Sequence, residues 1–145
     1  MRLFFIAAAA LGLSACGQSE TETVRQHVNE ATAFSNYPFS AAVIVGKTIY
    51  LSGEIGLMED GKLAEGVGAQ TAQIFKNYEK TLAGMGASLA DIVKCTVFLD
   101  DMSDYGEMNA AYAAALPDPK PARSTFGVEG LAMGAALEIE CLAIK

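Results

Sequence analysis

Two runs of apolar and β-branched residues with a short polar break between them predict a β-hairpin over residues 41–52. Two runs rich in β-branched residues, 41–45 and 48–52, flank Gly46 and Lys47. A two-residue connection that contains glycine is typical of hairpins, because glycine readily adopts the positive φ angles of these tight turns. We therefore expect two antiparallel strands near the start of the folded domain.

Further along the chain the apolar residues follow the period of a helix rather than that of a strand. The first helical stripe consists of Val67, Ile74, Phe75, Tyr78, Leu82 and Met85. Gly84 and Gly86 end this helix, and residues 88–91 have the spacing of a short capped turn. The stripe of a second helix consists of Tyr105, Met108, Tyr112, Ala115 and Leu116. Three closely spaced prolines follow, and they predict an extended segment up to Arg123.

Residues 93–99 and 137–142 alternate as strands with one mostly apolar face. The predicted order is therefore ββ-α-β-α-β-β, an α+β fold with a mixed sheet and two helices packed on one face. The opposite face carries polar residues mixed with apolar ones. That mixture suits a subunit interface better than bulk solvent.

Residues 1–15 have the layout of a secretory signal. A positive start, an apolar run over residues 3–13 and small residues precede Cys16, and the run is too short to span a bilayer. The Leu-Ser-Ala-Cys sequence resembles the lipobox of bacterial lipoproteins, which implies that Cys16 is lipidated. The alternative is an ordinary buried cysteine in an N-terminal helix. Gly17 after the cysteine, in place of Asp, favours sorting to the outer membrane.

Residues 16–35 are polar and predict a tether, so that residues 36–145 form a single compact domain. The expected location is the cell envelope, on the periplasmic side and anchored by lipid. His27 is the one histidine in the sequence and lies in the predicted tether. A Ser-His-Asp triad would therefore lack its base, and a zinc site built on histidine is excluded in the same way, so no metal is expected.

The charge of the chain argues against one class of partner, and its cysteines raise the question of a disulfide. The chain has 10 Lys and Arg against 17 Asp and Glu, a formal net charge of −7, and its few basic residues are scattered. This distribution argues against a nucleic-acid interface. Cys95 and Cys141 alternate with apolar residues along predicted strands, so we expect packed free thiols. A disulfide is the alternative in an exported domain.

Arg123 and Glu138 are the candidate chemical groups. A guanidinium matches a carboxylate with a planar fork, and a carboxylate on a strand can move protons. Taken alone, Arg123 could be a structural ion-pair partner and Glu138 an ordinary exposed strand residue. Glu140 shares the face of Glu138 and is expected to be solvated or ion-paired.

Five motifs follow one another along the domain: residues 52–56 (SGEIG), 91–99 (DIVKCTVFL), 108–112 (MNAAY), 117–125 (PDPKPARST) and 137–140 (LEIE). Together, in this order, they resemble the RidA family, also called YjgF, of imine and enamine deaminases. The resemblance covers residues 38–145. It implies a chorismate-mutase-like fold and a homotrimer with active sites in clefts between subunits.

The resemblance also implies hydrolysis of small 2-imino acids and their enamine tautomers, such as 2-iminopropanoate and 2-iminobutanoate, to 2-keto acids and ammonia without a cofactor. Arg123 would hold the substrate carboxylate, and Glu138 would position or activate the attacking water. The other implied site residues are Ser52 and Gly53 on the pocket wall, Asn109 in support, and Thr125 at a position often held by Cys or Thr.

Two positions depart from the family pattern. Relatives commonly carry a Tyr after the proline where this chain has Phe39, so the phenol that would reach the substrate is missing there. Glu54 replaces a frequent Gln and adds negative charge beside the pocket wall. The rival hypothesis is a non-catalytic trimer that binds small carboxylated ligands, or a surface interaction protein, for which Arg123 alone would suffice.

Overall fold

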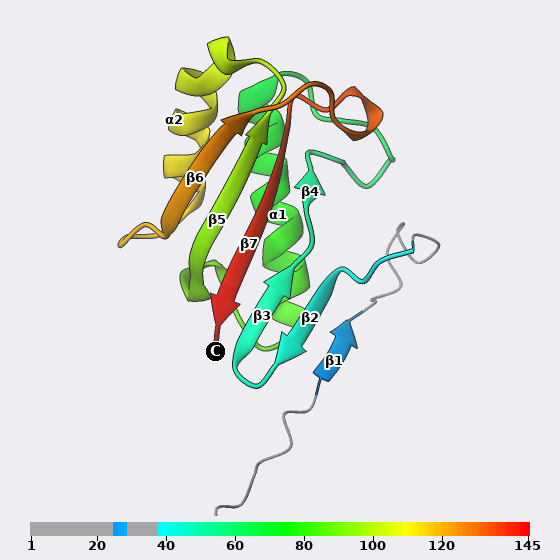
Figure 1. Cartoon of the computed structure of the whole chain (residues 1–145), viewed down its shortest axis with the longest axis vertical. Helices are drawn as coiled ribbons and strands as arrows, with labels where there is room; N and C mark the ends of the chain where they lie inside the picture. The colour runs from blue at the N-terminus through cyan, green and yellow to red at the C-terminus, as the bar shows by residue number, and fades with distance from the viewer. Residues whose placement is uncertain (1–24, 29–37) are drawn as a thin grey trace, which may run out of the picture.

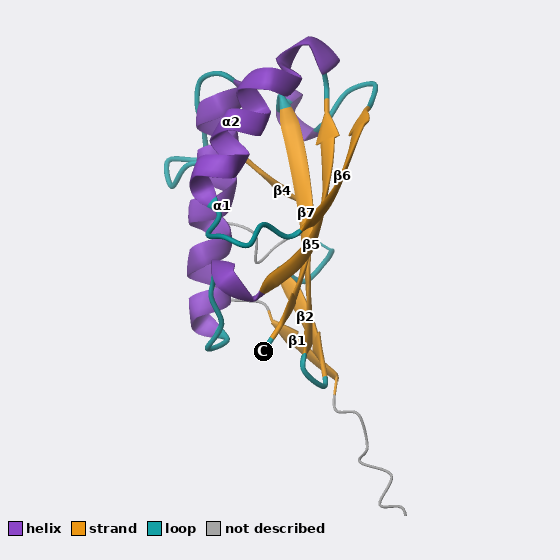
Figure 2. Cartoon of the chain, turned by 90° about the vertical axis from the view of Figure 1, so that its left-hand side faces the viewer, coloured by secondary structure: helices purple, strands orange, loops and turns teal. Residues whose placement is uncertain are grey.

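The computed structural model describes residues 25–28 and 38–145, which form one mixed β-sheet with two helices on a single face (Figures 1 and 2). The sheet has the order β1-β2-β3-β7-β5-β6, with β4 paired to β7. Its strands are β1 (Arg25–Val28), β2 (Ala42–Val45), β3 (Thr48–Leu51), β4 (Glu54–Ile55), β5 (Ile92–Leu99), β6 (Ala122–Gly127) and β7 (Leu137–Ile144). The helices are α1 (Val67–Gly84) and α2 (Tyr105–Ala115). The predicted fold class is confirmed.

Strand β6 lies at the edge of the sheet, next to β5, and α2 packs against it. β5 pairs antiparallel with β7 on one side and parallel with β6 on the other. Parallel neighbours need a crossover connection, and here that connection contains α2. β6 therefore lies at the edge of the sheet with α2 against its helix-side face, as Figure 1 shows.

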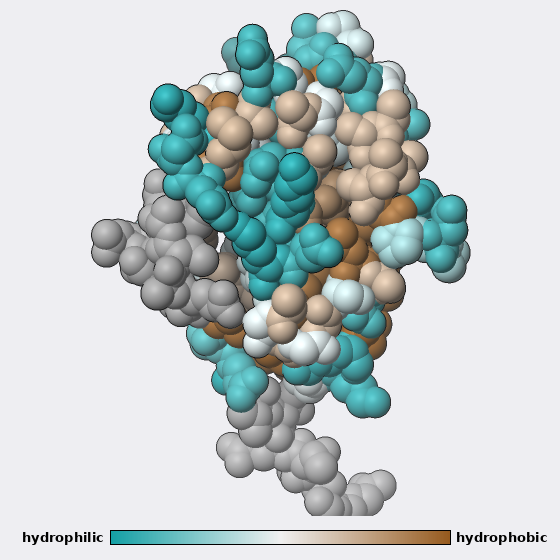
Figure 3. All heavy atoms as spheres, turned by 180° about the vertical axis from the view of Figure 1, so that it is seen from behind, coloured by the Kyte–Doolittle hydropathy of each residue, from teal (hydrophilic) through white to brown (hydrophobic). Residues whose placement is uncertain are grey.

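The core lies between the sheet and the predicted helical stripes. Ile74, Phe75 and Leu82 of α1 are fully buried, and Met108 and Tyr112 anchor α2. Gln70 and Thr71 of α1 are buried as well, whereas its charged side chains Lys76, Glu79 and Lys80 are exposed. Seen from the helix side, hydrophilic residues cross the middle of the surface over α1, while weakly hydrophobic ones gather over α2 (Figure 3). Amphipathic packing of this kind is what the helical period predicts.

The face of the sheet turned away from the helices is uncovered in a single chain (Figure 2). It contains an open hollow of about 500 Å³. Half-exposed Tyr50 lines the hollow together with polar residues such as Lys94, Thr96 and Glu140. Glu140 is exposed, and the mixture of apolar and polar side chains expected for this face is present.

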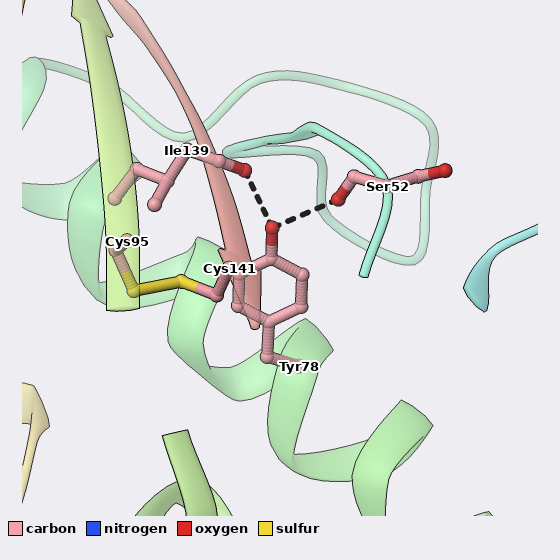
Figure 4. Close-up of a disulfide and its surroundings, with 5 residues drawn as sticks. All are labelled: Ser52, Tyr78, Cys95, Ile139 and Cys141. Atoms are coloured by element: carbon pink, nitrogen blue, oxygen red, sulfur yellow. Dashed lines mark hydrogen bonds between the residues drawn. A yellow bond between two sulfur atoms is a disulfide. The ribbon is translucent and has the colours of Figure 1, made fainter. Parts of the chain in front are cut away.

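Cys95 and Cys141 form a disulfide between β5 and β7 (Figure 4), so the prediction of free thiols was wrong. The two residues are direct partners in the antiparallel register and are both buried. Side chains directly opposite one another on one face of an antiparallel pair lie close enough to bond. The register that makes them partners depends on sheet topology, which the alternation of each strand does not reveal.

Two short strands were not predicted. β1 has the sequence RQHV and pairs with β2, so residues 25–28 belong to the sheet rather than to the expected tether. His27 Nδ1 lies 3.2 Å from Ser40 Oγ. The proposed signal, Cys16 and the rest of the tether lie outside the described residues. Within residues 25–28 and 38–145, no helix is long and apolar enough to cross a membrane.

Candidate functional site

Arg123 lies on the edge strand β6 and is held by α2. Its Nη2 atom donates hydrogen bonds to Asn109 Oδ1 at 2.8 Å and to Tyr105 Oη at 3.0 Å. Its guanidinium carbon lies 4.6 Å from the ring centre of Tyr112 and 5.7 Å from that of Tyr105. Aromatic faces attract a guanidinium, and the hydrogen bonds fix its direction. Arg123 is thus oriented entirely by one helix of its own chain.

Two hydroxyl groups beside this arginine lack a hydrogen-bond partner among the described residues. They are Tyr112 Oη and Thr125 Oγ1, and both atoms are buried. Burial raises the pKa of Tyr112, and the charge of Arg123 acts in the opposite direction. Buried polar atoms of folded proteins are nearly always paired, so these hydroxyls indicate room for a water molecule or a polar ligand on this side of the sheet. Arg123, Asn109, Tyr105, Tyr112 and Thr125 are called the arginine half-site below.

Glu138 lies on β7 in direct contact with Gly53. A Cβ atom added to Gly53 would lie 2.0 Å from Glu138 Oε1, so glycine allows this carboxylate to keep its present position. The carboxylate of Glu138 accepts no hydrogen bond from the described part of the chain, and the residue is partly buried. It is therefore positioned by contact with the backbone rather than by donors.

Ser52 precedes Gly53 in the chain and is hydrogen-bonded to the segment that contains Phe39. Ser52 Oγ donates a hydrogen bond of 2.6 Å to the carbonyl oxygen of Ser40, the residue after Phe39. The buried hydroxyl of Tyr78 donates to the carbonyl oxygens of both Ser52 and Ile139 (Figure 4). Phe39 is 52% exposed. Glu138, Gly53, Ser52 and the neighbouring Phe39 are called the glutamate half-site below.

The two half-sites lie on opposite faces of the sheet in one chain. Arg123 pairs with Cys95, whose side chain points into the core beneath the helices. Glu138 pairs with Phe98 and lies between the core residues Leu137 and Ile139, so its side chain points to the uncovered face. The structure therefore brings Asn109 and Thr125 to Arg123, and Ser52 and Gly53 to Glu138. It does not bring Arg123 and Glu138 together within one chain.

A partly buried polar network supports the strand β4 beside Glu138. Asn77 of α1 donates to Glu54 Oε1 at 2.9 Å and to the carbonyl oxygen of Leu57 at 3.0 Å. Gln73 donates to Asn77 Oδ1 at 2.8 Å. Burial raises the pKa of Glu54 to about 7; the hydrogen bond from Asn77 lowers it, and repulsion from Glu138 raises it further. Glu54 thus changes charge close to neutral pH, beneath the glutamate half-site.

Sequence reasoning missed the roles of Tyr105 and Tyr112, which it assigned to the apolar stripe of the second helix. The signal was available in their spacing from Asn109. Residues 105, 109 and 112 follow at i, i+4 and i+7, so one face of α2 presents all three toward β6. The described residues contain no group of three or more His, Cys, Asp or Glu side chains that could hold a metal ion.

The family model described as endoribonuclease L-PSP matches residues 29–145. This match spans most of the sequence, and the chain belongs to that family, which is also known as the RidA or YjgF family.

Named relatives are similar over the folded domain. The chain is 42% identical over 108 residues to the chloroplastic Reactive Intermediate Deaminase A of Arabidopsis thaliana, covering 73% of this chain and 58% of that protein. It is 37% identical over 110 residues to the human 2-iminobutanoate/2-iminopropanoate deaminase, covering 74% of this chain and 80% of the relative. The crystal structure of RidA from an Antarctic Psychrobacter species has a TM-score of 0.73 at 36% identity, covering 82% and 94% of the two chains.

Proposed function

We propose that this protein is a deaminase that hydrolyses small 2-imino acids and their enamine tautomers to 2-keto acids and ammonia. The observation that carries the proposal is the arginine half-site. Asn109 and Tyr105 fix its cation, and its two buried hydroxyls have no partner within residues 25–28 and 38–145. Such a cluster suits the carboxylate of a small acid. Relatives named as deaminases of this substrate class support the choice of reaction.

The proposed active site lies between two copies of the chain. Arg123 and Glu138 occupy opposite faces of one sheet, so one subunit would supply the arginine half-site and its neighbour the glutamate half-site. A homotrimer, the assembly typical of the family, would provide such contacts. The uncovered sheet face around Tyr50 and Lys94 is the surface available for packing against another copy.

In the proposed reaction Arg123 holds the substrate carboxylate while Glu138 accepts a proton from the attacking water. The water oxygen bonds to the imine carbon, and the proton passes to nitrogen. Glu138 then carries the hydroxyl proton of this carbinolamine to the amino nitrogen, the carbon–nitrogen bond breaks, ammonia leaves and the carbonyl forms. This chemistry needs the protein to orient a carboxylate and one water molecule, which are tasks that the two half-sites suit.

The test uses 2-iminopropanoate generated from alanine by an amino-acid oxidase, with the remaining imine trapped by semicarbazide. The protein is expected to reduce trapping, and Arg123→Ala to abolish that effect. Equal trapping with protein and with buffer alone would refute deamination of this substrate. Binding of 2-oxobutanoate that is lost in Arg123→Ala, without any turnover, would instead support the rival carboxylate-binding function.

We further propose that the protein is exported and anchored by lipid on Cys16, on the periplasmic side and at the outer membrane. The order of charge, apolar run, small residues and cysteine in the sequence supports this location. The disulfide between Cys95 and Cys141 is of a kind that persists in oxidising compartments. Radiolabelled palmitate should be incorporated by the full chain and not by Cys16→Ser, and equal labelling of both would exclude an anchor at Cys16.

A further inference from the structure

Tyr105 and Asn109 both accept hydrogen bonds from one terminal nitrogen of Arg123. Both accept hydrogen bonds from Nη2, at 3.0 Å and 2.8 Å respectively. A terminal guanidinium nitrogen carries two hydrogens, so these two acceptors engage both of them. Nη1 and Nε donate to no acceptor within the described residues.

A carboxylate that grips Arg123 through both terminal nitrogens needs a hydrogen from Nη2. One of the two present acceptors must therefore release its hydrogen bond when such a ligand binds. Asn109 Oδ1 and Tyr105 Oη differ in what happens next. Asn109 could offer a hydrogen of Nδ2 only by turning its whole amide, which would remove the acceptor from Arg123. A phenolic hydroxyl can instead turn its O–H bond in place and donate.

Tyr105 is also placed to make this exchange. It is the first residue of α2 and is 40% exposed. Its hydrogen bond to Arg123 is the longer of the two. A rotation of the O–H bond, with a small shift of the ring, would convert the acceptor of Arg123 into a donor to the ligand.

We propose that Tyr105 is a ligand-binding residue of the arginine half-site, whose hydroxyl accepts a hydrogen bond from Arg123 in this structure and donates one to the carboxylate of a bound 2-oxo or 2-imino acid. The proposal rests on the proposed function only in its choice of a carboxylated ligand. It implies that Tyr105 helps the site to select acids over the corresponding amides. The hydroxyl forms a stronger hydrogen bond with a charged carboxylate than with a neutral amide.

The test measures binding of 2-oxobutanoate and of 2-oxobutanamide to the purified protein by isothermal titration calorimetry. Tyr105→Phe removes the hydroxyl and keeps the ring over Arg123. It should weaken binding of the acid by roughly 3- to 10-fold, the effect of one lost hydrogen bond to a charged group, and weaken binding of the amide by less. Tyr105→Leu removes the ring as well and should weaken acid binding further. Thermal unfolding of each variant controls for folding.

The outcomes separate the two proposals. Equal acid binding by Tyr105→Phe and the unmodified protein would overturn the role of the hydroxyl, even if Tyr105→Leu bound weakly. Weaker acid binding by Tyr105→Phe in a protein without deaminase activity would support Tyr105 and refute the reaction. Failure of the unmodified protein to bind 2-oxobutanoate would overturn both. In an active protein Tyr105→Phe should raise KM more than it lowers kcat, because the carboxylate is held in the ground state and the transition state alike.

Discussion

The two half-sites of this chain are built in different ways. Arg123 is held by two hydrogen bonds and two aromatic rings, all supplied by α2 of the same chain. Glu138 lies against the backbone of Gly53, and its carboxylate accepts no hydrogen bond from the residues that the structure describes. The cation is therefore oriented before any partner arrives. The carboxylate depends on a neighbour, water or ligand for its final direction.

The strongest test of this difference inactivates one half-site in each of two variants and then assembles the two variants together. Arg123→Ala and Glu138→Gln should each lower kcat/KM by about 10²–10⁴-fold, the usual effect of losing a proton-transfer or charge-stabilising group. If each site takes one half from each of two subunits, trimers co-assembled from equal amounts of the two variants should recover about a quarter of the unmodified activity. The imine-trapping assay on co-expressed protein measures this.

Sites built within one subunit would give a different result, because each variant chain would then carry one broken half of every site. Mixing would recover no activity above that of the separate variants. Size-exclusion chromatography with light scattering establishes that mixed trimers form.

Gly53→Ala tests the glutamate half-site alone. The new Cβ would lie 2.0 Å from Glu138 Oε1, so the carboxylate must move. We expect kcat to fall by about 10- to 100-fold, the effect of misplacing a catalytic group by an ångström, with a smaller change in KM. Gly106→Ala is the matched control, because a Cβ there meets nothing within 4 Å. Equal kinetics for Gly53→Ala and the unmodified protein would show that the position of Glu138 does not matter.

The disulfide links β5, which pairs with the strand of Arg123, to β7, which carries Glu138. Its loss tests whether the two half-sites need this covalent link to keep their positions. It closes a separation of 46 residues. The Cys95→Ala/Cys141→Ala double variant should lose about 2–4 kcal/mol of unfolding free energy in urea while retaining most of its activity at 25 °C. Reduced unmodified protein, unfolded in dithiothreitol, separates the cross-link from side-chain packing. A double variant as stable as the oxidised protein would show that the bond adds nothing.

Glu54→Gln tests the network beneath the glutamate half-site. The pKa of Glu54 is about 7 in the folded chain against an ordinary value of 4.5 for a glutamate, so the folded state binds this proton more tightly than the unfolded state. The ionised carboxylate therefore lowers stability increasingly as the pH rises from about 4.5 to about 7. Glu54→Gln keeps an acceptor for Asn77 and should be more stable than the unmodified protein by about 2–3 kcal/mol at pH 8, with little difference at pH 5.

Urea unfolding across that pH range gives the measurement, and Glu79→Gln on the exposed surface of α1 is the control. A stability difference for Glu54→Gln that does not vary with pH would contradict the raised pKa.

Long periodic segments were predictable from the sequence, and short or paired features were not. Helix α1 and strands β5 and β7 show clear apolar periods, so their residues determine their elements. β4 has two residues and β1 is polar, so both form through pairing with a neighbour rather than through a pattern of their own. Pairing is a property of the assembled sheet.

The candidate site was predictable by residue but not by geometry. Arg123 and Glu138 were identified from their chemistry and motifs. The face on which Arg123 lies depends on its register with Cys95, and the extended, proline-rich approach to β6 carries no alternation that would reveal it. The same register makes Cys141 the partner of Cys95. The registers of β5 with β6 and with β7 cannot be predicted from the sequence of these strands. They explain both why the half-sites are separated and why the disulfide was not expected.

Because the disulfide is buried, its presence also depends on the conditions under which the chain folded. Cys95 and Cys141 are 0% and 3% exposed, so an oxidant reaches their sulfur atoms only before the sheet and helices close over them. A chain that folds among reductants would bury two thiols and keep them beyond the reach of later oxidation. The two-hydrogen difference in mass between these forms would report, in protein isolated from cells, the surroundings in which each molecule first folded.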